Sequence, residues 1–109
     1  MEIKSTKRFR NKLADILDYA SMEFGQKTVQ KWQEKLVVIL NNLRSNPEMY
    51  PFVPELHDVQ SNAHGVIVMK NFKIVFVLNS KKQIVQLGDI WDMRQDPDRL
   101  RRSWKIIRL

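Results

Sequence analysis

Apolar residues recur at spacings of three and four through the first 45 positions of the chain. One stripe consists of Phe9, Leu13, Ile16, Leu17, Ala20 and Phe24. A second consists of Val29, Trp32, Leu36, Ile39, Leu40 and Leu43. This spacing places each set on one face of an α-helix. Gly25 separates the two stripes and Pro47 follows the second, so we expect two helices with a very short connection, which must lie antiparallel.

The pattern changes to strand-like runs after a long connection. Residues 65–69, 72–78 and 84–92 are predicted strands, and three consecutive strands favour an antiparallel meander. Gly88 lies inside the last run and indicates a β-bulge. Residues 1–5 are a candidate edge strand, with Ser5 or Thr6 as the N-cap of the first helix. The prolines of residues 48–62 should keep that connection out of the sheet, with its aromatic side chains holding it to the core. Together these elements predict one α+β domain over residues 1–109.

The strand at 72–78 is apolar on both sides. Phe72, Ile74, Phe76 and Leu78 point one way, and Val75 and Val77 point the other together with Lys73. Because the helical hairpin can cover only one face, something else must cover the second. The C-terminal tail, a second copy of the chain or a partner protein would each suffice.

The C-terminal segment is strongly basic. Asp96 and Pro97 predict the start of a helix. Residues 98–109 then contain Arg99, Arg101, Arg102, Lys105 and Arg108, with Asp98 as the only acid. Leu100, Trp104 and Ile107 fall at helical spacing, which predicts a basic amphipathic helix. The alternative is a frayed, solvated terminus.

The net charge, the absence of cysteine and the few histidine and glycine residues narrow the possible classes of site and partner. The net charge of +7 favours a polyanionic or acidic partner. The absence of cysteine excludes disulfides, a thiolate nucleophile and Cys-ligated zinc. The two histidines, seven positions apart, do not make a metal site, and three scattered glycines do not make a phosphate-binding loop. We therefore expect no metal and no cofactor. With neither a signal peptide nor an apolar run of about 20 residues, we expect a cytoplasmic protein without membrane contact.

Four segments, in this order, resemble the RelE/ParE superfamily of bacterial toxins. Leu13–Tyr19 followed by Phe24-Gly25 is similar to the first helix of these toxins, and Leu43–Pro51 to their "NPE" connection. Asn71–Phe76 resembles their central strand, and Ile90–Pro97 the last strand of ParE-like members, with Arg before a "DP" step. The resemblance covers the chain from about Ile3 to Leu100. It implies a short strand, a helical hairpin on a meander, and a basic tail.

The resemblance also implies one of two activities. RelE-like members cleave messenger RNA on the ribosome, whereas ParE-like members poison DNA gyrase without chemistry of their own. In both, an antitoxin protein holds the toxin inactive. For a nuclease the matching residues here are His64, Lys73 and Arg94, but no Tyr or His follows Arg94 to donate a proton. Lys73 also lacks the fork of the arginine usual in that strand. We therefore expect a non-enzymatic, ParE-like toxin, with an endoribonuclease as the alternative and a non-toxic binding module or decayed toxin as a third possibility.

Two sets of binding residues follow. Target binding, to gyrase or another topoisomerase, is assigned to Arg94, Arg99, Arg101, Arg102, Trp104 and Lys105. Antitoxin binding is assigned to Lys73, Val75, Val77 and Arg94. Plainer interpretations stay open: Arg94 can simply pair with Asp92 or with Asp96, His64 can have no role, and Trp104 can anchor the tail to the sheet. Trp32 and Trp91 are expected in the core.

Overall fold

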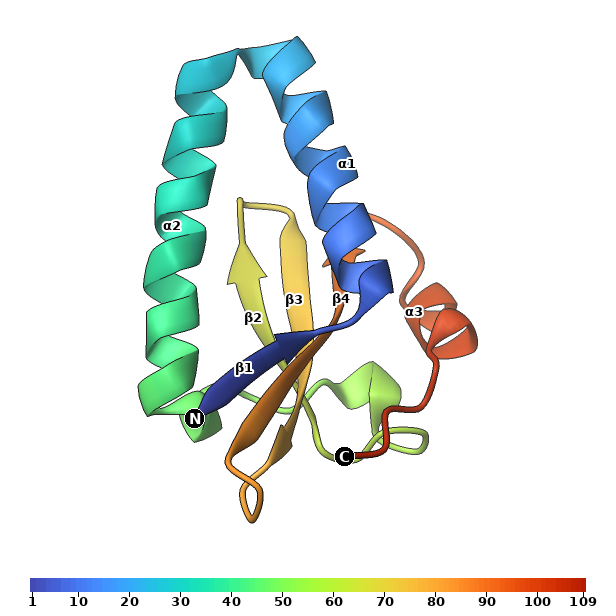
Figure 1. Cartoon of the computed structure of the whole chain (residues 1–109). Helices are drawn as coiled ribbons and strands as arrows, with labels where there is room; N and C mark the ends of the chain where they lie inside the picture. The colour runs from blue at the N-terminus through green and yellow to red at the C-terminus, as the bar shows by residue number, and fades with distance from the viewer.

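The computed structural model describes residues 1–109 and shows an α+β fold in which the predicted elements occur in the predicted order (Figure 1). The elements are β1 (Glu2–Ser5), α1 (Lys7–Phe24), α2 (Gln26–Ser45), two 3-10 turns (Pro47–Met49 and Pro54–Leu56), β2 (Ala63–Val68), β3 (Phe72–Asn79), β4 (Ile84–Asp92) and α3 (Pro97–Ser103). None of the helices has the length and apolar character needed to cross a membrane.

The sheet has four strands in the order β1-β4-β3-β2. The meander β2-β3-β4 is antiparallel, and β1 adds to its edge parallel to β4. The predicted bulge is confirmed: Val75 lies opposite Asp89 and Phe76 opposite Leu87, so Gly88 is the unpaired residue. The turn between β2 and β3 has three residues, Met69–Asn71, because β2 ends at Val68, one residue before the predicted end of that strand at residue 69.

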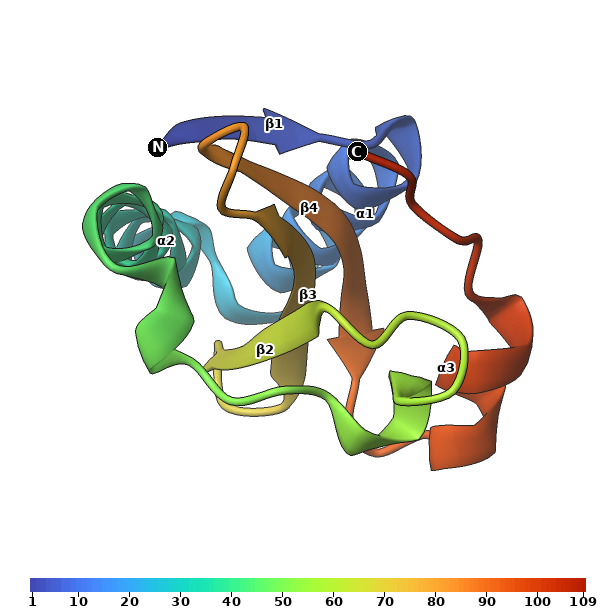
Figure 2. The same ribbon diagram turned by 90° about the horizontal axis from the view of Figure 1, so that it is seen from below.

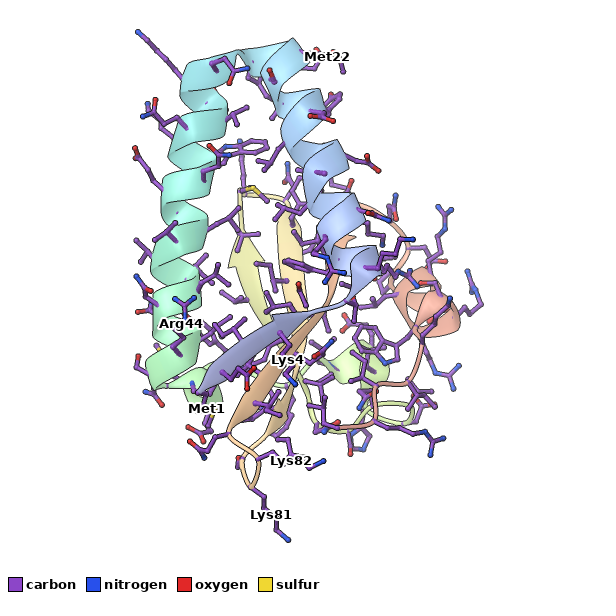
Figure 3. The ribbon with its side chains drawn as sticks, viewed as in Figure 1. Met1, Lys4, Met22, Arg44, Lys81 and Lys82 are labelled. Carbon is purple, nitrogen blue, oxygen red and sulfur yellow. The ribbon has the colours of Figure 1, made fainter.

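Local caps define the hairpin. Thr6 is the N-cap of α1, since its Oγ1 accepts a hydrogen bond from the Phe9 backbone N–H at 3.1 Å. Gly25 alone joins α1 to α2 with φ at +85°, a value that glycine adopts without strain. At the other end, the Met1 amino group donates to the Arg44 carbonyl at 2.7 Å, which ties β1 to the end of α2 (Figure 3).

The hairpin covers one face of the sheet and forms the larger core with it. Members of this core come from α1, α2 and every strand of the meander, and include Phe9, Leu36, Leu43, Ile74, Phe76 and Leu87. Trp32 is only partly buried against it. The predicted alternation along β3 is therefore confirmed for the face that carries Ile74 and Phe76.

The second face of the sheet is covered by the chain itself. Val75 and Val77 are both fully buried, and Val75 belongs to a smaller core that contains Val53 and Leu56 of the connection and Leu100 of α3. Figure 2 shows α2 and α3 on opposite sides of the sheet. The assignment of Val75 and Val77 to antitoxin binding is thus wrong, because a partner could reach them only after the connection and α3 had moved.

The connection joins the sheet more closely than its prolines predicted. Phe52 forms an isolated antiparallel bridge with His64 at the outer edge of β2. The Gly65 N–H donates to the Pro51 carbonyl and the Val53 N–H to the Ala63 carbonyl, both at 3.0 Å. Proline here supplies an acceptor, which requires no N–H of its own.

The tail is helical only in its first part. Asp96 caps α3 as expected, with its carboxylate accepting from the Asp98 N–H at 3.1 Å. The helix ends at Ser103, so the prediction of a continuous amphipathic helix to residue 109 is wrong. Trp104 and Ile107 instead lie against Gly88, where an added Cβ would come within 2.8 Å of either side chain. Contacts with the sheet thus hold the last six residues in a non-helical path.

Candidate protein-interaction sites

A large open groove lies between the two helices of the hairpin and the end of the sheet that carries the β2–β3 turn. It has a volume of about 650 Å³ and is lined by both helices, by the β2–β3 turn and by the end of β4. Its apolar and aromatic walls are Ile16, Tyr19, Phe24, Trp32, Met69 and Phe72, and its charged lining consists of Asp15, Lys35, Lys70, Asp92 and Arg94. We refer to these residues as the hairpin groove.

The groove exists because the hairpin reaches beyond the sheet (Figure 1). The apolar stripes of α1 and α2 run to the hairpin tip, but the strands cover only their lower part. Tyr19 is 55% exposed and Phe24 57% exposed, although both are large and apolar. Phe24 also contacts Tyr19 edge-on and Trp32 at a tilt, which forms an aromatic cluster facing the opening. A large apolar surface with charged residues at its rim is typical of a protein-binding site.

Arg94 lies in this groove and is paired with Asp92. Its Nε donates to Oδ1 of Asp92 at 3.0 Å and its Nη2 to Oδ2 at 2.9 Å. These hydrogen bonds lower the pKa of Asp92 and raise that of Arg94. The plain interpretation of Arg94 as a partner of Asp92 is therefore confirmed. The pair remains accessible, since the Arg94 side chain is 64% exposed.

The structure does not assemble the three residues considered for a nuclease. His64 lies opposite Phe76 and therefore on the hairpin side of the sheet, whereas Lys73 lies opposite Trp91 on the other side. Arg94 follows β4 in the hairpin groove. Because two of the three side chains point to opposite faces, they cannot act on one phosphate together.

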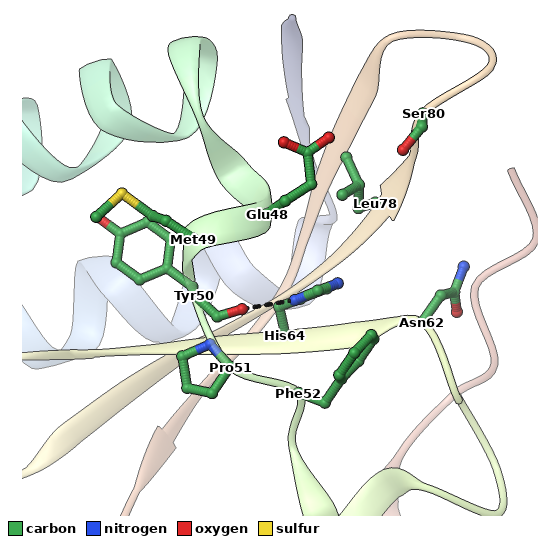
Figure 4. A pocket seen from close by; sticks show the side chains of 9 residues that line it. All are labelled: Glu48, Met49, Tyr50, Pro51, Phe52, Asn62, His64, Leu78 and Ser80. Atoms are coloured by element: carbon green, nitrogen blue, oxygen red, sulfur yellow. Dashed lines mark hydrogen bonds between the residues drawn. The ribbon is translucent and has the colours of Figure 1, made fainter.

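His64 has a structural explanation. Its Nδ1 lies 2.9 Å from the Tyr50 carbonyl oxygen, which can only accept, so Nδ1 carries the proton (Figure 4). The ring packs between Phe52 and Phe76, with centroid distances of 4.3 and 5.5 Å. Its neighbours Glu48, Asn62 and Ser80 line a shallow pocket but supply no cation for a phosphate. Lys73 is likewise partly buried, with its aliphatic stem over Gly65.

The second accessible site is the basic surface of α3 and the tail, defined here as Arg99, Arg101, Arg102, Lys105 and Arg108. All five side chains belong to exposed residues. Arg99, Lys105 and Arg108 make no ion pair, and Arg102 lies 3.8 Å from Asp96. The surface therefore offers free positive charge to a partner.

Two residues assigned to target binding also hold the tail in place. Arg101 donates through Nε to both carboxylate oxygens of Asp58 at 3.0 Å, and through Nη2 as well. These hydrogen bonds lower the pKa of Asp58. The indole of Trp104 is partly buried and donates to Oε1 of Gln60 at 3.1 Å. Trp104 thus anchors the tail, as one of the two interpretations of the sequence proposed.

Sequence reasoning missed two features of these sites. The stripes place Phe24 and Trp32 on the faces of the helices that pack on the core, because nothing in the periodicity separates the covered part of a helix from the part that projects, and Tyr19 lies outside both stripes. Gln60 is the second feature: it is almost fully buried and bonded to the tail. A lone glutamine in a proline-rich connection carries no sequence signal of that role.

Comparison with known proteins identifies the family. The sequence model of the ParE toxin of the type II toxin–antitoxin system parDE matches residues 3–97. A search of curated proteins gave no match. Among solved structures, the chain is similar to one from the chromosomal ParDE toxin–antitoxin system of P. aeruginosa, with 16% sequence identity and a TM-score of 0.65. The similarity covers 84% of this chain and 95% of that one, and at this identity it establishes the fold. Because the family match spans most of its length, this chain belongs to the ParE toxin family of type II toxin–antitoxin systems.

Proposed function

We propose that the protein inhibits growth by binding a DNA topoisomerase such as gyrase, and that an antitoxin neutralises it by occupying the hairpin groove. Membership of the ParE family supports the toxin role. The observation that carries the proposal is the separation of two surfaces: an apolar groove at the hairpin mouth and a basic surface on α3 and the tail. A partner can bind to the groove, and another to the basic surface, without displacing any part of the core.

The groove suits an amphipathic segment of a partner. Such a segment would place apolar side chains on Ile16, Phe24 and Trp32. Lys35 and Lys70 line the same groove, and Arg94 stands at its rim, so acidic side chains on the partner would find cations there. The net charge of +7 favours an acidic partner over a second copy of this chain.

The basic surface is the proposed contact with the topoisomerase. Its free cations would steer the protein toward an acidic surface and bind there stoichiometrically. No catalytic step is assigned, because His64, Lys73 and Arg94 do not converge on one face.

Expression of the chain alone in a bacterial host tests the mechanism. We expect growth arrest with DNA breaks and inhibited supercoiling by purified gyrase, and intact messenger RNA in the same cells. Ribosome-dependent cleavage of messenger RNA that disappears in Arg94→Ala would instead make the protein a nuclease. Normal growth and normal supercoiling would leave it a non-toxic binding module.

A groove variant tests the antitoxin site. Tyr19→Glu adds a charge to an exposed position on α1, so folding should be retained. We expect the affinity for the cognate antitoxin to fall by about 10- to 100-fold, since the carboxylate would be desolvated against an apolar partner. Val37→Glu is the matched control, because Val37 is 56% exposed on α2 and does not line the groove. Equal affinities of the two variants would remove the groove from the interface.

A further inference from the structure

The side-chain amide of Gln60 holds the end of the tail. Gln60 is 6% exposed, although it carries a polar amide. Its Oε1 accepts hydrogen bonds from the Ile107 backbone N–H at 2.8 Å and from Trp104 Nε1 at 3.1 Å. Its Nε2 donates to the Ile107 carbonyl at 3.1 Å and to Oδ1 of Asn62 at 2.7 Å. Three of these hydrogen bonds therefore join Gln60 to the tail, and the fourth, to Asn62, fixes the orientation of the Gln60 amide.

The amide acts on Ile107 as a neighbouring strand would. A primary amide presents one donor and one acceptor side by side, and Ile107 is bonded through both its N–H and its carbonyl. Such a two-point contact fixes the orientation of the backbone as well as its position. Residues 104–109 form no helix and no strand, so this side chain replaces the ladder that would otherwise orient them.

We refer to the hydrogen bonds between the Gln60 side chain and the tail as the clamp. With the tail held in this orientation, some of its side chains face the sheet and others face solvent. Trp104, Ile107 and Leu109 are partly buried, whereas Lys105 and Arg108 are exposed. The inward side is fitted to the bulge at Gly88, where only the absence of a side chain leaves room for Trp104 and Ile107. A tail rotated about its axis would lose this fit and would turn the two cations toward the sheet.

We propose that Gln60 is a positioning residue for target recognition: it sets the orientation in which Lys105 and Arg108 meet the topoisomerase. The inference rests on the proposed function, in which the basic surface contacts that target. Gln60 itself touches no target, because the tail lies over it.

Two variants remove the clamp from opposite sides. Gln60→Leu keeps most of the side-chain volume but removes all four hydrogen bonds. Ile107→Pro removes the N–H that donates to Gln60 and leaves the connection untouched. If the first variant fails to fold, the second still gives the test. Gln33→Ala is the control, since Gln33 is an exposed residue of α2 far along the chain from the tail.

Limited trypsin digestion measures how firmly the tail is held, and growth inhibition measures whether its orientation matters for the target. We expect cleavage after Lys105 to accelerate by about tenfold or more in both variants, because the tail would open locally. Thermal unfolding and antitoxin binding should stay near wild type, while growth inhibition and gyrase binding are lost. Gln33→Ala should match the wild type in every assay.

Three results would overturn the inference. Unchanged cleavage after Lys105 would mean that Gln60 does not hold the tail. A loosened tail with full growth inhibition would mean that its orientation is irrelevant to the target. A wild-type chain that does not inhibit growth would overturn the proposed function and this inference with it, whereas an inhibitory wild type beside equally inhibitory variants would overturn the inference alone.

Discussion

Three small residues, Thr6, Gly25 and Gly88, allow neighbouring segments to meet closely. Thr6 caps α1 and also donates through Oγ1 to the Gly88 carbonyl at 3.0 Å, which joins the helix start to the bulge. Gly25 allows two helices to meet at a single residue. Gly88 has no side chain, which leaves room on β4 for Trp104 and Ile107 of the tail. Each of these roles depends on a small side chain or on none.

Replacing Gly88 by alanine should release the tail before it unfolds the sheet. The new Cβ would lie 2.8 Å from both Trp104 and Ile107, and these belong to the terminal segment, which can move away. We expect cleavage after Lys105 to rise while global stability falls by only about 1–2 kcal/mol. Trypsin digestion and chemical denaturation measure the two effects; a large loss of stability with a protected tail would contradict this order of events.

The pair between Arg101 and Asp58 should be visible in the titration of the carboxyl group. Hydrogen bonds from Arg101 lower the pKa of Asp58 in the folded protein. A lowered folded pKa stabilises the fold above the unfolded pKa, and this contribution disappears as the pH falls through the folded pKa. In Arg101→Gln we expect the Asp58 pKa to rise toward its ordinary value, as measured by NMR. The same pKa in both proteins would show that the pair is not formed in solution.

At the scale of elements, α3 and the last six residues have different tasks. Leu100 in α3 is 1% exposed and belongs to the smaller core with Val53 and Leu56. Of the residues after Ser103, Trp104, Ile107 and Leu109 are partly buried and the others are exposed. The α3 helix therefore covers the sheet through Leu100 while its arginines stay exposed, and the tail beyond it carries the rest of the basic surface.

Two truncations should separate these tasks. Deletion of residues 104–109 should leave a folded protein that binds its antitoxin but no longer inhibits growth. Deletion of residues 99–109 also removes Leu100 and exposes Val75, so we expect aggregation. A single Leu100→Ala change should cost about 2–5 kcal/mol. Thermal unfolding and size-exclusion chromatography distinguish the cases; a monomeric, stable product of the longer deletion would show that α3 does not cover the sheet.

For the whole molecule, the distribution of charge and apolar surface predicts two kinds of binding. The basic surface offers unpaired cations, and its attraction to an acidic target is screened by salt. The hairpin groove exposes more apolar than polar surface, and the burial of apolar side chains depends little on ionic strength. The two partners should therefore respond differently to the same change of buffer.

Surface plasmon resonance at rising salt measures this difference. Between about 50 and 300 mM NaCl we expect the association rate with gyrase to fall by roughly tenfold or more, because electrostatic steering weakens. Dissociation of the antitoxin complex should change by less than about threefold, since apolar contacts govern it. Equal salt responses of the two complexes would argue against separate surfaces.

Local patterns in the sequence account for the elements and their order. Stripes of period three to four predicted α1 and α2, two-sided apolar runs predicted β3, and Gly88 predicted the bulge, because each of these signals arises from local backbone geometry. The same residues carried the family resemblance that the match over residues 3–97 bears out.

Which apolar surfaces stay open depends on contacts between segments that are far apart in the sequence. The sequence required a cover for Val75 and Val77, but it could not distinguish the connection and Leu100 from a partner, since either supplies the same apolar contacts. The helical stripes did not reveal that Tyr19 and Phe24 project past the sheet. The extended tail was also hidden, because its local periodicity favours a helix while Gly88 and Gln60, distant in sequence, stabilise another path.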